Sequence, residues 1–113
     1  MSLGPRGEPR KARIARNEAL FREVNERVEE MTAASASDGI DFVCECGDPE
    51  CTSSVPLTRA EYERVRSDPV LFAIVPGHEI LDVEDVVARD ERFYLVRKHV
   101  DEQDVARGLD PRS

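Results

Sequence analysis

Tryptophan is absent from this chain of 113 residues, and aromatic residues make up only 5% of it. No apolar run approaches the ~20 residues of a membrane-spanning helix, and the N-terminal residues lack the apolar core of a secretory signal. We therefore expect no membrane insertion and a cytoplasmic location. Apolar residues still reach 40%, which favours one small domain with an aliphatic core. Such a core often needs a staple, either a metal or an oligomer interface.

Basic residues are scarce outside the N-terminal segment. The net charge is −8, yet residues 1–16 carry five basic residues against one acid, and the remainder carries 11 against 23. The composition predicts a disordered basic arm over residues 1–12. Because an acidic body repels phosphate, we expect no specific nucleic-acid binding by the folded part.

Glycine and proline are missing from residues 11–32, which predicts a long amphipathic N-terminal helix over residues 13–34. Its apolar seam repeats at spacings of four and three: Asn17, Phe21, Val24, Val28 and Met31. Two uses are open for this seam. One is packing within the chain's own core. The other is self-association through Phe21, Val24, Val28 and Met31, in which Asn17 would fix the register of the paired helices.

The remaining pattern mixes short strands with one short helix. Alternating or β-rich apolar runs predict strands at residues 40–44, 55–57, 71–75 and 92–98. Residues 83–89 fit a strand or a helix, and the turn at Asp90-Glu91 suggests a hairpin with the strand that follows.

Thr58 and Glu61 form a capping-box pattern, which predicts a helix over 59–66 that ends before Pro69. Residues 101–107 fit a short helix or a tail. The expected fold class is α+β: the long N-terminal helix, a small mainly antiparallel sheet, one short helix and a zinc-stapled loop. The zinc-binding α+β domain is expected over residues 38–107.

All three cysteines lie within eight residues, Cys44-Glu45-Cys46-Gly47-Asp48-Pro49-Glu50-Cys51, in the pattern C-x-C-x4-C. An odd number in a reducing compartment argues against disulfides, and thiolates suit tetrahedral zinc. Gly47 permits a sharp bend, and Asp48-Pro49 favours a turn that returns the chain toward the ion. We therefore predict that Cys44, Cys46 and Cys51 bind Zn²⁺. Redox-active thiols and inert buried thiols are the alternatives.

The fourth ligand is predicted to be His78, with His99, a carboxylate or water as alternatives. His78 follows the run 72–75, which we expect to pair in the same sheet as the strand that ends at Cys44. The turn at Pro76-Gly77 would then carry the imidazole over the cysteine loop. A [2Fe–2S] cluster with three cysteines and one histidine is a further alternative.

Two resemblances add to this interpretation. The pattern C-x-C-G-x3-C over residues 44–51 resembles the zinc knuckle of the post-SET segment of SET-domain methyltransferases. The resemblance implies that this loop binds zinc with a fourth ligand from a distant part of the chain. It does not imply methyltransferase activity, because the chain has no SET-type substrate or cofactor motif. Residues 20–99, with the cysteine loop and Pro76-Gly77-His78, resemble a group of small uncharacterised bacterial proteins. That resemblance supports the boundaries and implies no activity.

The sequence contains no Ser-His-Asp order, no glycine-rich phosphate loop and no H-E-x-x-H motif. Acids beside the cysteines (Glu45, Asp48 and Glu50) are expected to raise the pKa values of the thiols and so to disfavour redox chemistry. The function predicted is a small zinc-stabilised binding or adaptor protein. A thiol-based redox enzyme or a metal-dependent enzyme is the alternative.

Overall fold

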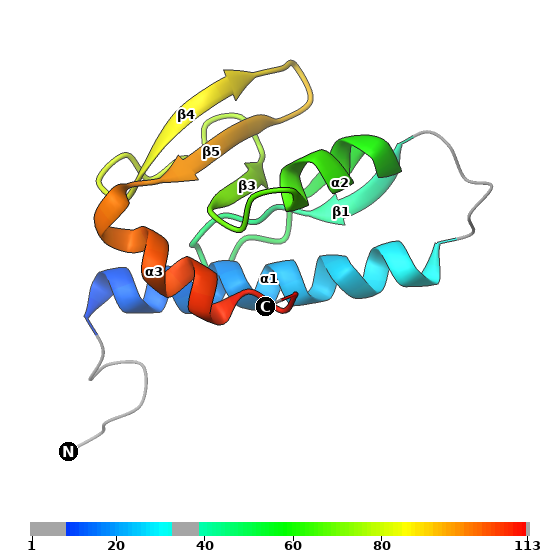
Figure 1. Ribbon diagram of the computed structural model, residues 1–113. Coiled ribbons are helices and arrows are strands. Elements are labelled where there is room, and N and C mark those ends of the chain that lie inside the picture. The colour runs from blue at the N-terminus through cyan, green and yellow to red at the C-terminus, as the bar shows by residue number, and fades with distance from the viewer. Residues whose placement is uncertain (1–8, 33–38, 113) are drawn as a thin grey trace.

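The computed structural model describes residues 9–32 and 39–112 (Figure 1). In chain order its elements are α1 (Arg10–Met31), β1 (Ile40–Val43), β2 (Ser54–Leu57), α2 (Arg59–Arg66), β3 (Leu71–Ile74), β4 (Glu84–Arg89), β5 (Tyr94–Lys98) and α3 (Val100–Leu109). The predicted α+β class is confirmed. None of the helices in the described ranges is both long enough and apolar enough to cross a bilayer.

The strands form two antiparallel sheets instead of the single sheet that we expected. β1 pairs with β2, and β5 lies between β3 and β4. The ambiguous segment at 83–89 is a strand because β4 pairs with β5, with Val86 opposite Val96 and an irregularity between Val86 and Ala88. This pairing sets apolar side chains of the two strands opposite each other, which stabilises the hairpin.

Helix α2 begins as the sequence predicts. The Thr58 hydroxyl accepts from the backbone N–H of Glu61, and the Glu61 carboxylate accepts from the backbone N–H of Thr58. One face of α2 buries Tyr62, whose ring stacks on Phe42 of β1 at 4.3 Å between centroids. The C-terminal segment, which the sequence left open between a short helix and a tail, is a helix, α3.

Helix α1 runs along one side of the molecule, with α3 beside its N-terminal half and the strands above it (Figure 1). It begins at Arg10, directly after Pro9, and ends at Met31, compared with the predicted 13–34. Residues 10–12 of the predicted arm are therefore helical. Residues 1–8 and 33–34 lie outside the described residues.

The predicted seam of α1 only partly coincides with its packing face: Val28 packs against the core and Phe21 is half-buried. Val24 is 39% exposed and Met31 is 85% exposed, whereas the buried positions are Ile14, Glu18, Arg22 and Asn25. The prediction was wrong for Val24 and Met31 because it ranked only apolar side chains. The surface that α1 covers carries buried charges, so charged and amide side chains pack against it.

Glu18 of α1 meets a buried cross-strand ion pair. The Lys98 ammonium donates to Glu18 Oε1 at 2.8 Å and to Glu84 Oε1 at 3.2 Å, and Glu84 and Lys98 are opposite residues of β4 and β5. All three side chains are at most 2% exposed. Burial raises the pKa of Glu18 to about 8; Lys98 opposes this rise and Glu84 adds to it. A neutral Glu18 balances the site, because Lys98 then faces one carboxylate.

This burial predicts a pH dependence of stability. The folded pKa of Glu18 lies above the unfolded value, so the folded state holds an extra proton that it loses as pH rises to about 8. The free energy of unfolding should fall by up to about 1.4 kcal/mol per pH unit from this group between about pH 5.5 and 7.5. Urea denaturation at several pH values should show that the free energy of unfolding falls less steeply with pH for Glu18→Gln than for the wild type. The control Glu23→Gln, on the exposed side of α1, should keep the wild-type slope. Equal slopes for wild type and Glu18→Gln would contradict the assignment.

Candidate metal centre

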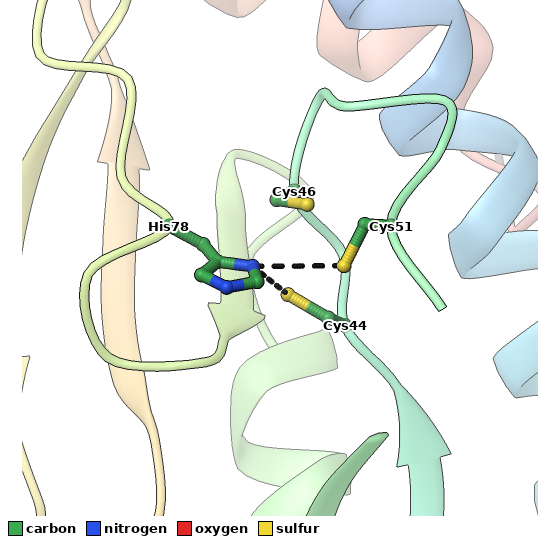
Figure 2. A group of neighbouring side chains, drawn as sticks. All are labelled: Cys44, Cys46, Cys51 and His78. Atoms are coloured by element: carbon green, nitrogen blue, oxygen red, sulfur yellow. Dashed lines mark hydrogen bonds between the residues drawn. The ribbon is translucent and has the colours of Figure 1, made fainter. Parts of the chain in front are cut away.

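Four side chains from two loops converge on one point (Figure 2). Cys44, Cys46 and Cys51 lie in the loop between β1 and β2, and His78 follows β3. One ligand atom from each lies within 4.8 Å of all the others. The His78 Nδ1 atom is 3.6 Å from the Cys44 sulfur and 3.5 Å from the Cys51 sulfur. Tetrahedral zinc with its usual bond lengths places sulfur and nitrogen ligands roughly 3.6 Å apart. The four residues predicted from the sequence are thus brought together with suitable spacing.

Backbone hydrogen bonds give the cysteine loop its shape. The Cys44 N–H donates to Ser53 O at 3.0 Å, and the Cys51 N–H donates to Asp48 O at 3.1 Å. The Asp48 carboxylate accepts from the Glu50 N–H at 2.9 Å, as in an Asx turn. The Asp48-Pro49 turn therefore returns Cys51 to the cluster, as predicted.

Gly47 has a different role from the one expected. Its φ is not among the positive values, which occur at Gly39 and Gly77. A Cβ at Gly47 would lie 2.4 Å from Ile14 Cγ2 and 3.1 Å from Ile80 Cδ1. Glycine is required here because α1 approaches the loop closely. Asn17, predicted to set register in a dimer, donates from Nδ2 to Gly47 O at 3.2 Å within the same chain.

A tight turn carries His78 to the cluster. The His78 N–H donates to Val75 O at 3.0 Å, and Gly77 between them has φ of 94°. Proline followed by glycine at a positive φ is the pattern of a type II turn. His99 lies elsewhere: it precedes α3, and its Nε2 is 3.3 Å from Asp85. Of the two histidines, the structure places His78 with the thiols.

The route from β3 to the site differs from the expected one. β3 pairs with β5 and not with the sheet that contains β1. Two other bonds hold it beside the cysteine loop: the Glu45 N–H donates to Ala73 O at 2.9 Å, and the Val75 N–H donates to the Cys44 sulfur at 3.2 Å. N–H donation to sulfur stabilises a thiolate.

Glu45 lies between the first two cysteines, and we expected its negative charge to act on the thiols. The structure instead directs its carboxylate away from them. Its carboxylate is fully buried and accepts from Arg22 Nη2 at 3.1 Å, Asn25 Nδ2 at 2.9 Å and the Ala73 N–H at 3.2 Å. Successive side chains of an extended segment point to opposite sides. Cys44 and Cys46 therefore face His78 while Glu45 faces α1. The C-x-C spacing thus places two thiols at the cluster and also directs the Glu45 carboxylate to its partners on α1.

Sequence reasoning missed Arg22 and Asn25 as residues that support the site. Arg22 also donates to the carbonyls of Pro69, at 3.1 Å, and Leu71, and its guanidinium lies 3.8 Å from the centre of the Phe72 ring. Asn25 donates to Val43 O and accepts from the Val43 N–H. The available signal was the spacing of Ile14, Glu18, Arg22 and Asn25, which places one apolar and three polar side chains on one face of the helix.

The thiols ionise unequally. A hydrogen bond between them lowers the pKa of Cys46 to about 5, while the same bond, together with burial, raises the pKa of Cys44. Cys44 is 2% exposed and Cys46 is 1% exposed. A cation at this point would face two sulfurs that are nearly closed to solvent and a third, from Cys51, that is half-buried. A hollow lined by Cys46, Asp48, Gly77, His78, Glu79 and Ile80 lies next to them.

Comparison with known proteins gave no match: no family model, curated protein or solved structure resembles the chain significantly.

The contact at Gly47 can be tested with a double-mutant cycle. Gly47→Ala should destabilise the protein by about 1–3 kcal/mol, because the new methyl overlaps Ile14. In an Ile14→Ala background the same change should cost less, since the overlapping Cγ2 atom is gone. Urea denaturation of the wild type, the two single variants and the double variant gives the coupling free energy between positions 14 and 47. Gly108→Ala is the matched control: no neighbouring atom lies within 4 Å of where its Cβ would be, so it should be neutral or stabilising. Equal costs of Gly47→Ala in both backgrounds would refute the contact.

Proposed function

We propose that Cys44, Cys46, Cys51 and His78 bind one Zn²⁺ and that the ion is structural. The observation that carries this proposal is the approach of three sulfurs and one imidazole nitrogen to within 4.8 Å of one another. Four protein ligands fill a tetrahedral shell, which is typical of structural zinc, whereas catalytic zinc keeps a position for water.

The charges of the site favour zinc with this role. Three thiolates and a neutral imidazole around Zn²⁺ sum to −1. Thiolates donate much charge and make the ion a poor Lewis acid, which disfavours the alternative of a metal-dependent hydrolytic enzyme. The thiols must be reduced to bind zinc, so the proposal includes residence in a reducing compartment such as the cytoplasm.

The proposed role of the whole protein is that of a small binding or adaptor module stapled by this ion. The ion would tie the β1–β2 loop to the turn after β3, two segments that contribute few apolar side chains of their own. The net charge of −8 favours a protein partner over nucleic acid, because phosphate is repelled.

Metal content tests the first step. Protein purified in reducing buffer without added metal should contain one zinc per chain by elemental analysis. His78→Ala should weaken zinc binding by about 10-fold or more in a competition assay with a chromophoric chelator. His99→Ala removes the same group outside the cluster and should have little effect. Iron in the protein together with visible absorption would show that the site holds an iron–sulfur cluster and not zinc. A larger loss of zinc affinity for His99→Ala than for His78→Ala would overturn the ligand set.

Removal of the ion tests its structural role. Structural zinc contributes on the order of 10 kcal/mol, which exceeds the stability of many small domains. We expect a strong chelator to abolish cooperative thermal unfolding and to broaden the amide NMR spectrum, and added zinc to restore both. An unchanged melting temperature in metal-free protein would rule out the structural role.

A further inference from the structure

The three sulfurs of the candidate metal centre differ in their access to solvent. Cys44 is 2% exposed and Cys46 is 1% exposed, whereas Cys51 is half-buried. The two segments that flank Cys51, residues 48–50 and 52–54, are exposed. The susceptibility of a cysteine to oxidation follows its thiolate character and its exposure. Cys51 is therefore the ligand that a small oxidant dissolved in water reaches first.

We propose that a hydroperoxide oxidises Cys51, that Cys46 then closes a disulfide with it, and that the site releases its zinc. This inference rests on the zinc site proposed above. The Cys51 thiolate attacks one oxygen of hydrogen peroxide, so an S–O bond forms, the O–O bond breaks and hydroxide leaves. The Cys46 thiolate then attacks the sulfenic sulfur, an S–S bond forms and a second hydroxide leaves. The two thiolates together lose two electrons, and the peroxide gains them.

The shape of the loop favours Cys46 as the partner of Cys51. In Figure 2 the chain leaves Cys46, turns and returns at Cys51, and the bond from the Cys51 N–H to Asp48 O holds this turn at 3.1 Å. The ligand atoms of the cluster lie within 4.8 Å of one another. Rotation of the two side chains therefore covers most of the approach to an S–S bond of about 2 Å.

The other two pairings of the thiols are less favourable. The Cys44 sulfur accepts from the Val75 N–H at 3.2 Å and would lose this bond on turning toward Cys51. A bridge between Cys44 and Cys46 is disfavoured because side chains two positions apart in an extended segment leave the backbone in parallel.

Loss of the ion follows from the number of ligands that remain. The disulfide removes two of the four ligands, and structural zinc sites hold their ion with four. Glu45 is joined to Cys46, so a rearranged backbone there also disturbs the hydrogen bonds that Glu45 accepts from Arg22 and Asn25 of α1. The α1 amides should therefore exchange hydrogen faster in the oxidised protein than in the zinc-loaded one, and equal exchange would contradict this coupling.

Peroxide treatment of the purified, zinc-loaded chain tests the inference. Zinc is measured before treatment. Hydrogen peroxide should then release one zinc for every two thiols lost, and dithiothreitol with added zinc should restore the starting state. Absence of zinc at the start would overturn the metal site and this inference with it. Zinc that stays bound after treatment would overturn only this inference.

Peptide mapping identifies the bridged pair. Cleavage after Glu45 and Glu50 places the three cysteines in different peptides, so mass spectrometry can distinguish every pairing once the remaining thiol has been alkylated. We expect Cys46 linked to Cys51 and Cys44 alkylated. A bridge that includes Cys44, or sulfinic acid at Cys51 without a bridge, would reject the proposed pairing.

Two matched variants assign the first step. Cys44→His and Cys51→His each keep four possible zinc ligands and remove one thiol. Cys44→His retains the proposed pair and should release zinc at about the wild-type rate, whereas Cys51→His should release it about 10-fold or more slowly. Zinc measured before treatment checks each variant, and the peptide map of the wild type decides the pairing even where a variant binds no zinc. Equal release from both zinc-loaded variants would refute the role of Cys51.

Discussion

The carboxylate of Glu45 is the point at which the candidate metal loop, β3 and α1 are tied together. It is buried, and it accepts hydrogen bonds from Arg22 and Asn25 of α1 and from the Ala73 N–H of β3. A buried charge of this kind is tolerated only when it is paired and fully hydrogen-bonded. The position of α1 is therefore restricted: a shift by one turn would leave Glu45 and Arg22 buried without partners.

The ion pair at Lys98 adds a second restriction of the same type about one turn away, at Glu18. Replacing a buried ion pair by apolar side chains is often neutral or stabilising, so such pairs are weak evidence for extra stability. Their geometric effect is clearer. An apolar face of α1 could slide along an apolar surface at small cost, whereas Glu18, Arg22 and Asn25 have satisfactory partners in one register only. Ile14 against Gly47 completes the fit, because the glycine lets the helix approach the loop.

These restrictions show which features could be predicted from the sequence. The capping box at Thr58, the strands with alternating apolar residues and the three cysteine ligands follow from local rules, since each depends on a few neighbouring residues. His78 was also predicted, but through a pairing of β3 with the sheet of β1 that the structure does not have. The face of α1 depends on charges contributed by Glu45, Glu84 and Lys98, which are distant in the sequence. A rule that ranks apolar residues selected the seam of Phe21, Val24, Val28 and Met31, of which Val24 and Met31 are exposed, and it missed the polar residues that face the body. The division of the strands into two sheets is likewise a tertiary property, because β3 pairs with β5 from far along the chain.

The same contacts link the proposed ion to the docking of α1. Cys44 and Cys46 flank Glu45, so the backbone that would hold two ligands also aims the carboxylate at Arg22. Without an ion, three sulfurs close together have no cation to balance them, and the loop loses the tie between Cys51 and His78. A loop that moves takes Glu45 with it and leaves the Arg22 guanidinium, stacked on Phe72, without its carboxylate. Removal of that partner destabilises the docking of α1 directly.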